Sequence, residues 1–121
     1  MYNSLVLAYM GDSIYEVYIR KYLIDQGIVK VDVLQKESIK YVSAKGQARA
    51  LKYLIDNNLL SKEEIDIVKR ARNHKSHRTK NTDIITYKHA TGLEALIGYL
   101  YLFKKYDRLD NIMKLIKEAI C

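Results

Sequence analysis

The feature that most constrains the fold is a pair of strongly apolar segments, each of which has an acidic residue set among apolar or small neighbours. The first runs from Leu5 to Tyr18 and contains Asp12; the second runs from Ala90 to Leu102 and contains Glu94. A helix that is apolar on most of its circumference is buried, either in its own core or against a partner chain. An ionised carboxylate is rarely buried without a partner. We therefore expect the two segments to pack together with the two acids facing each other across a cation.

The rest of the chain predicts an all-α fold. It has no proline, only 5 glycines in 121 residues, and long segments of helical periodicity. This length predicts a single domain over residues 1–121 with one modest core. We expect helices over residues 5–25, from 32 onward, and over 43–56, 61–72, 84–106 and 108–120. The expected N-terminal caps are Asp32, Ser43, and a capping box of Ser61 with Glu64.

Composition restricts the partners and the compartment. The formal net charge of +7 favours an anionic partner, and both nucleic acid and an acidic membrane surface are compatible with it. The single cysteine is the last residue, Cys121, so an intrachain disulfide is excluded and a reducing compartment fits. No signal peptide is recognisable, and no segment provides the roughly 20 apolar residues of a membrane span. The expected location is the cytoplasm, without a membrane partner.

The two acids are candidate metal ligands. Most acids in helices are solvated, but Asp12 and Glu94 have apolar or small neighbours at helical spacing, and Glu16 lies one turn after Asp12. Mg²⁺ suits such a sparse site, because it takes one or two carboxylates and keeps several waters. The ion could activate water and stabilise the leaving oxygen in phosphodiester hydrolysis. The alternative is a buried acid satisfied by an Arg or by one of the 11 tyrosines.

A polar segment over residues 73–83 is expected to form a loop, and a basic run leads into it. Six cations fall between residues 69 and 80 without any acid: Lys69, Arg70, Arg72, Lys75, Arg78 and Lys80. Because the run directly precedes the Glu94 segment, it could reach phosphates that flank the site. The alternative is an ordinary solvated surface. His74 and His77 have a spacing compatible with zinc, but no nearby Cys or acid completes such a site.

Two motifs resemble those of the ribonuclease III family. Residues 7–16, Leu-Ala-Tyr-Met-Gly-Asp-Ser-Ile-Tyr-Glu, are similar to its signature helix, and residues 91–98, Thr-Gly-Leu-Glu-Ala-Leu-Ile-Gly, to its second acidic motif. The closer resemblance is to the Mini-ribonuclease III branch, which lacks a double-stranded RNA-binding domain. That branch also has segments similar to residues 42–48 and to residues 70–75 leading into 80–83. The resemblance covers nearly the whole chain.

The resemblance implies an all-helical ribonuclease III endonuclease domain that works as a homodimer on double-stranded RNA. The implied reaction is Mg²⁺-dependent hydrolysis, with Mn²⁺ as a substitute, that leaves 5′-phosphate and 3′-hydroxyl ends. The Mini branch implies the precursor of 23S ribosomal RNA as substrate, and a ribosomal protein as helper is a further hypothesis. By position, Asp12 and Glu94 are the catalytic metal carboxylates. The basic residues expected to bind RNA are Arg70, Arg72, Lys75, Arg78 and Lys80.

The chain departs from the larger family members at two positions. Those enzymes place two further acids one turn before Asp12 and Glu94, where this chain has Ala8 and Thr91. The remaining ligands of the metal ion would be waters, Glu16 or Thr91. The departure also motivates a second hypothesis, a non-catalytic RNA-binding dimer on a nuclease scaffold. A third, a helix-turn-helix DNA binder, is weaker because no short recognition helix with polar residues at its start is visible.

Overall fold

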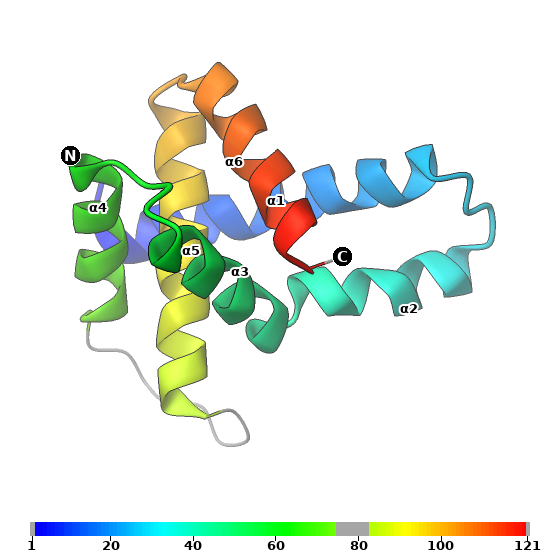
Figure 1. The fold of residues 1–121 in the computed structure, drawn as a ribbon, viewed down its shortest axis with the longest axis horizontal. Helices are drawn as coiled ribbons and strands as arrows, with labels where there is room; N and C mark the ends of the chain where they lie inside the picture. Colours follow the sequence, from blue (N-terminus) through cyan, green and yellow to red (C-terminus); the bar gives the residue numbers. More distant parts are fainter. Residues whose placement is uncertain (1, 75–82, 121) are drawn as a thin grey trace.

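The computed structural model describes residues 2–74 and 83–120, and these form six α-helices without any strand (Figure 1). The helices are α1 (Ser4–Asp25), α2 (Val31–Val42), α3 (Ala44–Asp56), α4 (Lys62–Arg72), α5 (Ile84–Leu102) and α6 (Tyr106–Ile120). The all-α prediction is confirmed. Figure 1 shows α1 and α2 side by side as an antiparallel pair, with α5 crossing α1.

Helix α5 is the centre of the core. It packs against α1, α3, α4 and α6. From Ala90 to Leu100 every residue is buried except Glu94, which is half-buried. Neighbouring helices therefore cover nearly the whole circumference of this segment, as its composition predicts. Glu94 is the one acidic or basic residue in that stretch.

The crossing of α1 and α5 brings two backbones into direct contact. A methyl group on Gly11 would overlap the carbonyl oxygen of Glu94, and one on Gly98 would overlap the carbonyl oxygen of Leu7. Only residues without a side chain fit at these two points. Because Asp12 follows Gly11 directly, the crossing places it beside Glu94.

Two of the three expected N-terminal caps are present. The hydroxyl of Ser43 accepts a hydrogen bond from the Gly46 amide at 3.1 Å. Ser61 and Glu64 form the reciprocal capping box. The prediction for Asp32 is wrong, because α2 begins one residue earlier and Asp32 lies in its first turn. There its negative charge still interacts favourably with the positive end of the helix dipole.

The fifth helix is shorter than predicted. It ends at Leu102 instead of residue 106, and Phe103 caps it. Lys104 then has a φ of 60°, which no helical residue adopts. Apolar periodicity continues through this turn, since Tyr106 belongs to the next helix, and for that reason the sequence pattern did not reveal the break.

Buried polar contacts fix the outer helices. Arg108 on α6 donates from Nε and Nη2 to the two carboxylate oxygens of Glu64, each at 2.8 Å, and from Nη2 to the Leu59 carbonyl at 2.7 Å. Tyr15 on α1 donates to the Tyr41 carbonyl at 2.8 Å and so attaches α2.

One face of α1 is apolar and uncovered. Tyr9 is 81% exposed, Val6 44% and Val17 60%. The sequence predicts burial of this helix in the core or against a partner chain, and within one chain this face remains open. Within residues 2–74 and 83–120, no helix is both long and apolar enough to span a bilayer.

Candidate active site

Asp12 and Glu94 meet where α1 crosses α5. Asp12 is exposed, Glu94 is half-buried, and a hydrogen bond joins their side chains. The juxtaposition comes from backbone contact between Gly11 and Glu94, so two rigid helices position the pair. The structure thus brings together the two acids that the sequence singled out.

The environment of Glu94 disfavours its negative charge. Burial raises its pKa to about 8, and both the charge of Asp12 and the hydrogen bond with Asp12 contribute to this increase. A hydrogen bond from Gln47 acts in the opposite direction. A cation beside the two carboxylates would favour the ionised form. Two ionised carboxylates at this site are therefore more stable with a bound metal ion than without one.

Gln47 on α3 is a third member of the site, and sequence reasoning did not single it out. It is only 2% exposed, and its Nε2 donates to the Val42 carbonyl at 3.2 Å. Its amide also hydrogen-bonds Glu94. Among the described residues, its Oε1 is buried without a hydrogen-bond partner. The available signal was its position, because Gln47 shares the inward face of α3 with Leu51 and Leu54 at helical spacing.

The residues fit a hard divalent cation. Two carboxylates and a nearby unpartnered amide oxygen are the donor type that Mg²⁺ and Mn²⁺ prefer. Within the described part of the chain, no group of three or more His, Cys, Asp or Glu side chains could hold a metal ion. An ion held by Asp12 and Glu94 would therefore keep several waters, as Mg²⁺ commonly does.

The candidates for completing the metal's ligands already have partners. The Thr91 hydroxyl donates to the Tyr87 carbonyl at 3.0 Å. The Glu16 carboxylate pairs with Arg20 on the helix surface at 3.2 Å. Both pairs are local to one helix, and both leave oxygen lone pairs for an ion, because the Thr91 hydroxyl is the donor and only Oε1 of Glu16 is paired.

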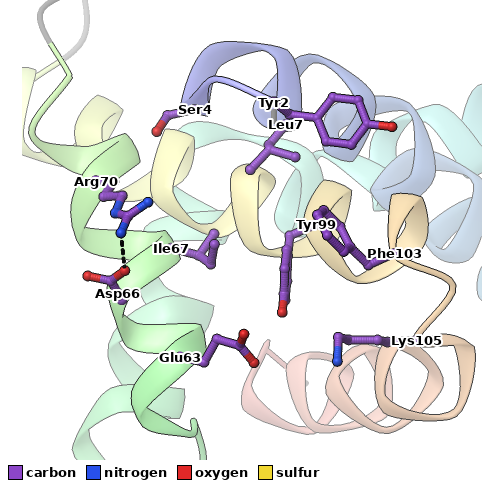
Figure 2. A pocket seen from close by; sticks show the side chains of 10 residues that line it. All are labelled: Tyr2, Ser4, Leu7, Glu63, Asp66, Ile67, Arg70, Tyr99, Phe103 and Lys105. Carbon is purple, nitrogen blue, oxygen red and sulfur yellow. Dashed lines mark ion pairs between the residues drawn. The ribbon is translucent and has the colours of Figure 1, made fainter.

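Arg70 lies beside a cavity of mixed charge. The cavity, of about 370 Å³, opens between the start of α1, α4 and the end of α5 (Figure 2). Glu63, Asp66 and Lys105 also line it, and Arg70 pairs with Asp66 at 2.9 Å. The two acids make this cavity a weak match for a polyanion.

Arg72 faces a different cavity, about 560 Å³ in volume, whose charged and polar lining is Arg49, Lys52, Arg72, His89 and one acid, Asp56, which pairs with Lys52. Residues two apart on a helix point about 200° apart, which separates Arg72 from Arg70. Three of the residues expected to bind RNA, Lys75, Arg78 and Lys80, lie outside the described residues, as does His77.

Arg49 also lines an adjacent cavity on the other side of α3, and so joins the two. We call the cations around both cavities the basic surface: Lys36, Lys40, Lys45, Arg49, Lys52 and Arg72. Ion pairs between described residues engage only Lys40 and Lys52 of this set. Sequence reasoning did not single out this surface, although Lys45, Arg49 and Lys52 repeat at helical spacing along α3.

The chain is similar over nearly its whole length to one group of proteins. Residues 5–105 match the family model described as Ribonuclease III domain. A relative from Thermoanaerobacter sp. (strain X514), named Mini-ribonuclease 3, is 49% identical over 98% of this chain and 82% of its own length. Another of that name, from Brevibacillus brevis, is 50% identical over 93% of this chain and 83% of its own.

A solved structure supports the same grouping. The crystal structure of a Fusobacterium nucleatum protein matches with a TM-score of 0.84 at 37% sequence identity. The match covers 97% of this chain and 93% of that chain. Both the sequence and the structural matches include the α1–α5 crossing, where Asp12 and Glu94 meet.

Proposed function

We propose that Asp12 and Glu94 hold the Mg²⁺ that the reaction of this chain requires. The chain belongs to the Mini-ribonuclease III branch of the ribonuclease III family and is an endoribonuclease for double-stranded RNA. The observation that carries the proposal is the convergence of these two carboxylates from distant parts of the sequence at one rigid helix crossing. Two acids placed together in this way cost free energy unless a cation or proton offsets their repulsion.

The chain's own residues prepare the site for hydrolysis. The exposed Asp12 carboxylate can reach a ligand in solvent, while the half-buried Glu94 carboxylate is held beside it. A bound divalent ion would supply an activated water and charge stabilisation at the leaving oxygen. Because the pKa of Glu94 is raised to about 8, this carboxyl group would lose its proton when it holds an ion near neutral pH. The expected products carry 5′-phosphate and 3′-hydroxyl ends.

The basic surface and the basic run together would bind the RNA backbone. Duplex RNA is recognised mainly through its shape, phosphates and 2′-hydroxyls, so cations spread over a surface suit it. Arg72 belongs to both groups, and the run continues to Lys75, Arg78 and Lys80 outside the described residues. Arg70 contributes less in this proposal, since it faces Asp66, although exposed pairs are weak enough to exchange for phosphate.

The uncovered apolar face of α1 supports a homodimer. Tyr9 is the most exposed of its apolar residues and lies one turn before Asp12, so a partner on this face would bring two sites near each other. Replacing Tyr9 by Arg should convert a dimer to a monomer in light scattering, with helical circular dichroism unchanged. A dimer that survives the substitution would place the interface elsewhere.

The proposed substrate is the precursor of 23S ribosomal RNA in the cytoplasm, with a bound ribosomal protein as a candidate helper. Purified chain incubated with a precursor stem, with and without ribosomal proteins, tests both parts. Cleavage of every duplex at an equal rate in all mixtures would remove the preference and the helper from the proposal.

A cleavage gel tests the metal assignment. Duplex RNA is incubated with Mg²⁺, with Mn²⁺ or with EDTA, using wild type, Asp12→Asn and Glu94→Gln. We expect products only with wild type and a divalent ion. The variants should lose more than about 100-fold in rate, because even outer-shell changes at metal sites cost about 10- to 100-fold. A variant that cuts at the wild-type rate contradicts the assignment.

The same gel separates the other hypotheses. A non-catalytic RNA-binding dimer predicts salt-dependent duplex binding and no product with either ion. A DNA-binding function predicts that duplex DNA competes with RNA for the chain as effectively as RNA itself. Single-stranded RNA of the same sequence is the control for strand specificity.

A further inference from the structure

Gln47 is a buried polar side chain next to the two acids, and the proposed reaction does not yet use it. It comes from the first turns of α3, behind the cap formed by Ser43. Among the described residues, it is the one uncharged polar side chain that acts as a hydrogen-bond partner of Glu94. Its segment, residues 42–48, is also one of those on which the family resemblance rests, yet no role follows from that resemblance.

Within the described residues, the Gln47 side chain donates hydrogen bonds and accepts none. Its Nε2 donates to the Val42 carbonyl, at the end of α2, and the amide is close enough to the Glu94 carboxylate to lower its pKa as a hydrogen-bond donor. The amide nitrogen has two N–H groups, so it can serve both acceptors. The side chain thus connects the α2–α3 junction to the carboxylate on α5.

The oxygen of the same amide has no such partner. Among the described residues, Oε1 is buried and accepts no hydrogen bond. A buried acceptor left in this way costs about 1–3 kcal/mol. An apolar side chain of similar shape would avoid that cost and would fit the apolar face that Gln47 shares with Leu51 and Leu54. The hydrogen bonds that the amide donates therefore have this cost set against them, and the net gain in stability is small.

We propose that Gln47 is a positioning residue that holds the Glu94 carboxylate toward Asp12, so that the pair can bind a divalent cation. The side chain of Glu94 has three rotatable bonds and lies at a half-buried edge, where water can draw it away from Asp12. A donor fixed by the Val42 carbonyl restricts it to one arrangement. This inference rests on the proposed metal role of Asp12 and Glu94.

The test measures metal binding without RNA and without turnover. Mn²⁺ is titrated into wild type, Gln47→Met, Gln47→Glu and Leu51→Met, and the EPR signal of the free ion reports binding. Gln47→Met keeps the length of the side chain but removes its donor. Leu51→Met is the matched control, a volume-conserving change one turn along the same buried face.

We expect Gln47→Met to weaken Mn²⁺ binding by about 10- to 100-fold, as loss of outer-shell partners does. Its melting temperature should change little, because loss of the hydrogen bond to the Val42 carbonyl and removal of the unpartnered amide oxygen act in opposite directions. Leu51→Met should bind Mn²⁺ like wild type. The Mg²⁺ concentration for half-maximal cleavage should rise in Gln47→Met in parallel with the loss of binding.

Two results would overturn the proposal. Wild-type Mn²⁺ affinity in Gln47→Met would show that the amide does not position Glu94. Tighter Mn²⁺ binding in Gln47→Glu would mean that this side chain is itself a ligand, because a carboxylate there cannot donate to Glu94. Failure of the proposed function looks different: wild type would not bind Mn²⁺, or Asp12→Asn would bind it equally well.

Discussion

The backbone of Gly11 lies against the carbonyl group of Glu94, with no room for a side chain between them. This contact joins the two helices that carry the candidate catalytic acids. The position of Asp12 relative to Glu94 is therefore set by the closest approach of two backbones, which is stiffer than any contact between long side chains. Stability and activity should depend on this one crossing together.

Gly11→Ala should destabilise the fold strongly. The added methyl group would overlap the Glu94 carbonyl oxygen, and backbone atoms cannot move aside as a side chain can. We expect a loss of about 3 kcal/mol or more in the free energy of unfolding, at the upper end of overpacking effects. Urea unfolding followed by circular dichroism measures it.

Gly92→Ala, on the partner helix α5, is the matched control. A methyl group there would lie 3.1 Å from Cγ1 of Val68, a side chain that can shift, and 3.2 Å from the Val68 carbonyl oxygen. Alanine also favours helix by about 1 kcal/mol relative to glycine. The net change should be small, and equal destabilisation by both variants would argue against a special role for the Gly11 contact.

Stability without divalent ions should fall as the pH rises. The pKa of Glu94 is raised to about 8 in the folded chain by burial, by the charge of Asp12 and by their hydrogen bond, while an unfolded Glu titrates near about 4.3. The folded chain holds this proton more tightly, so its contribution is complete below about pH 4 and is lost as the pH rises toward about 8. Thermal unfolding in EDTA across this range measures the decline.

Glu94→Gln and Mg²⁺ provide the controls for the pH dependence. The substitution removes the titrating group and should flatten the decline, and Mg²⁺ should reduce it because the ion stabilises the carboxylate. Parallel curves for wild type and Glu94→Gln in EDTA would mean that other groups cause the pH dependence.

Much of the fold followed from the sequence because its signals are local. The apolar circumference of residues 90–100 and the capping box at Ser61 depend on neighbours within a few residues, and both are present in the structure. Asp32 shows the limit of such signals: a residue suited to cap a helix also fits its first turn. The turn at Lys104 was missed because apolar residues occur on both sides of it.

The parts of the site that the sequence did not reveal depend on contacts between distant segments. Asp12 and Glu94 are visible in the sequence because a charge in an apolar segment is unusual. Gln47 is neutral, and its hydrogen bond to Glu94 exists only when α3 reaches α5. Arg49 and Arg72 likewise come together only when α3 and α4 line the same cavity.

Arg108→Met should destabilise the fold by about 3 kcal/mol. It would leave the buried Glu64 carboxylate without its bidentate partner, and removal of one member of a buried pair costs about 3–5 kcal/mol. The lower value applies because Arg108 is partly exposed. Lys21→Gln, which breaks an exposed pair with Asp25, should change stability by less than about 1 kcal/mol.

The loss in Arg108→Met should depend on pH. Burial raises the pKa of Glu64, but hydrogen bonds from Arg108 and Ser61 outweigh this effect and lower it below its usual range. The ionised pair therefore stabilises wild type above about pH 4, and this contribution is lost as the pH falls through the lowered pKa. Wild type and variant should converge in acid, and a constant difference across pH would contradict the ion-pair explanation.

Arg49→Gln combined with Arg72→Gln should weaken the binding of duplex RNA and flatten its dependence on salt. Each lost phosphate contact lowers the slope of log affinity against log salt concentration by about 1, so the double variant should lose about 2. Filter binding at several salt concentrations measures the slope.

Lys62→Gln is the control of equal charge, because Lys62 lies at the other end of α4, about 15 Å of helix rise from Arg72. Arg70→Gln should fall between them, since Arg70 faces the cavity that contains Asp66. If Lys62→Gln flattens the slope as much for each charge as Arg49→Gln and Arg72→Gln do, overall charge and not the basic surface governs binding.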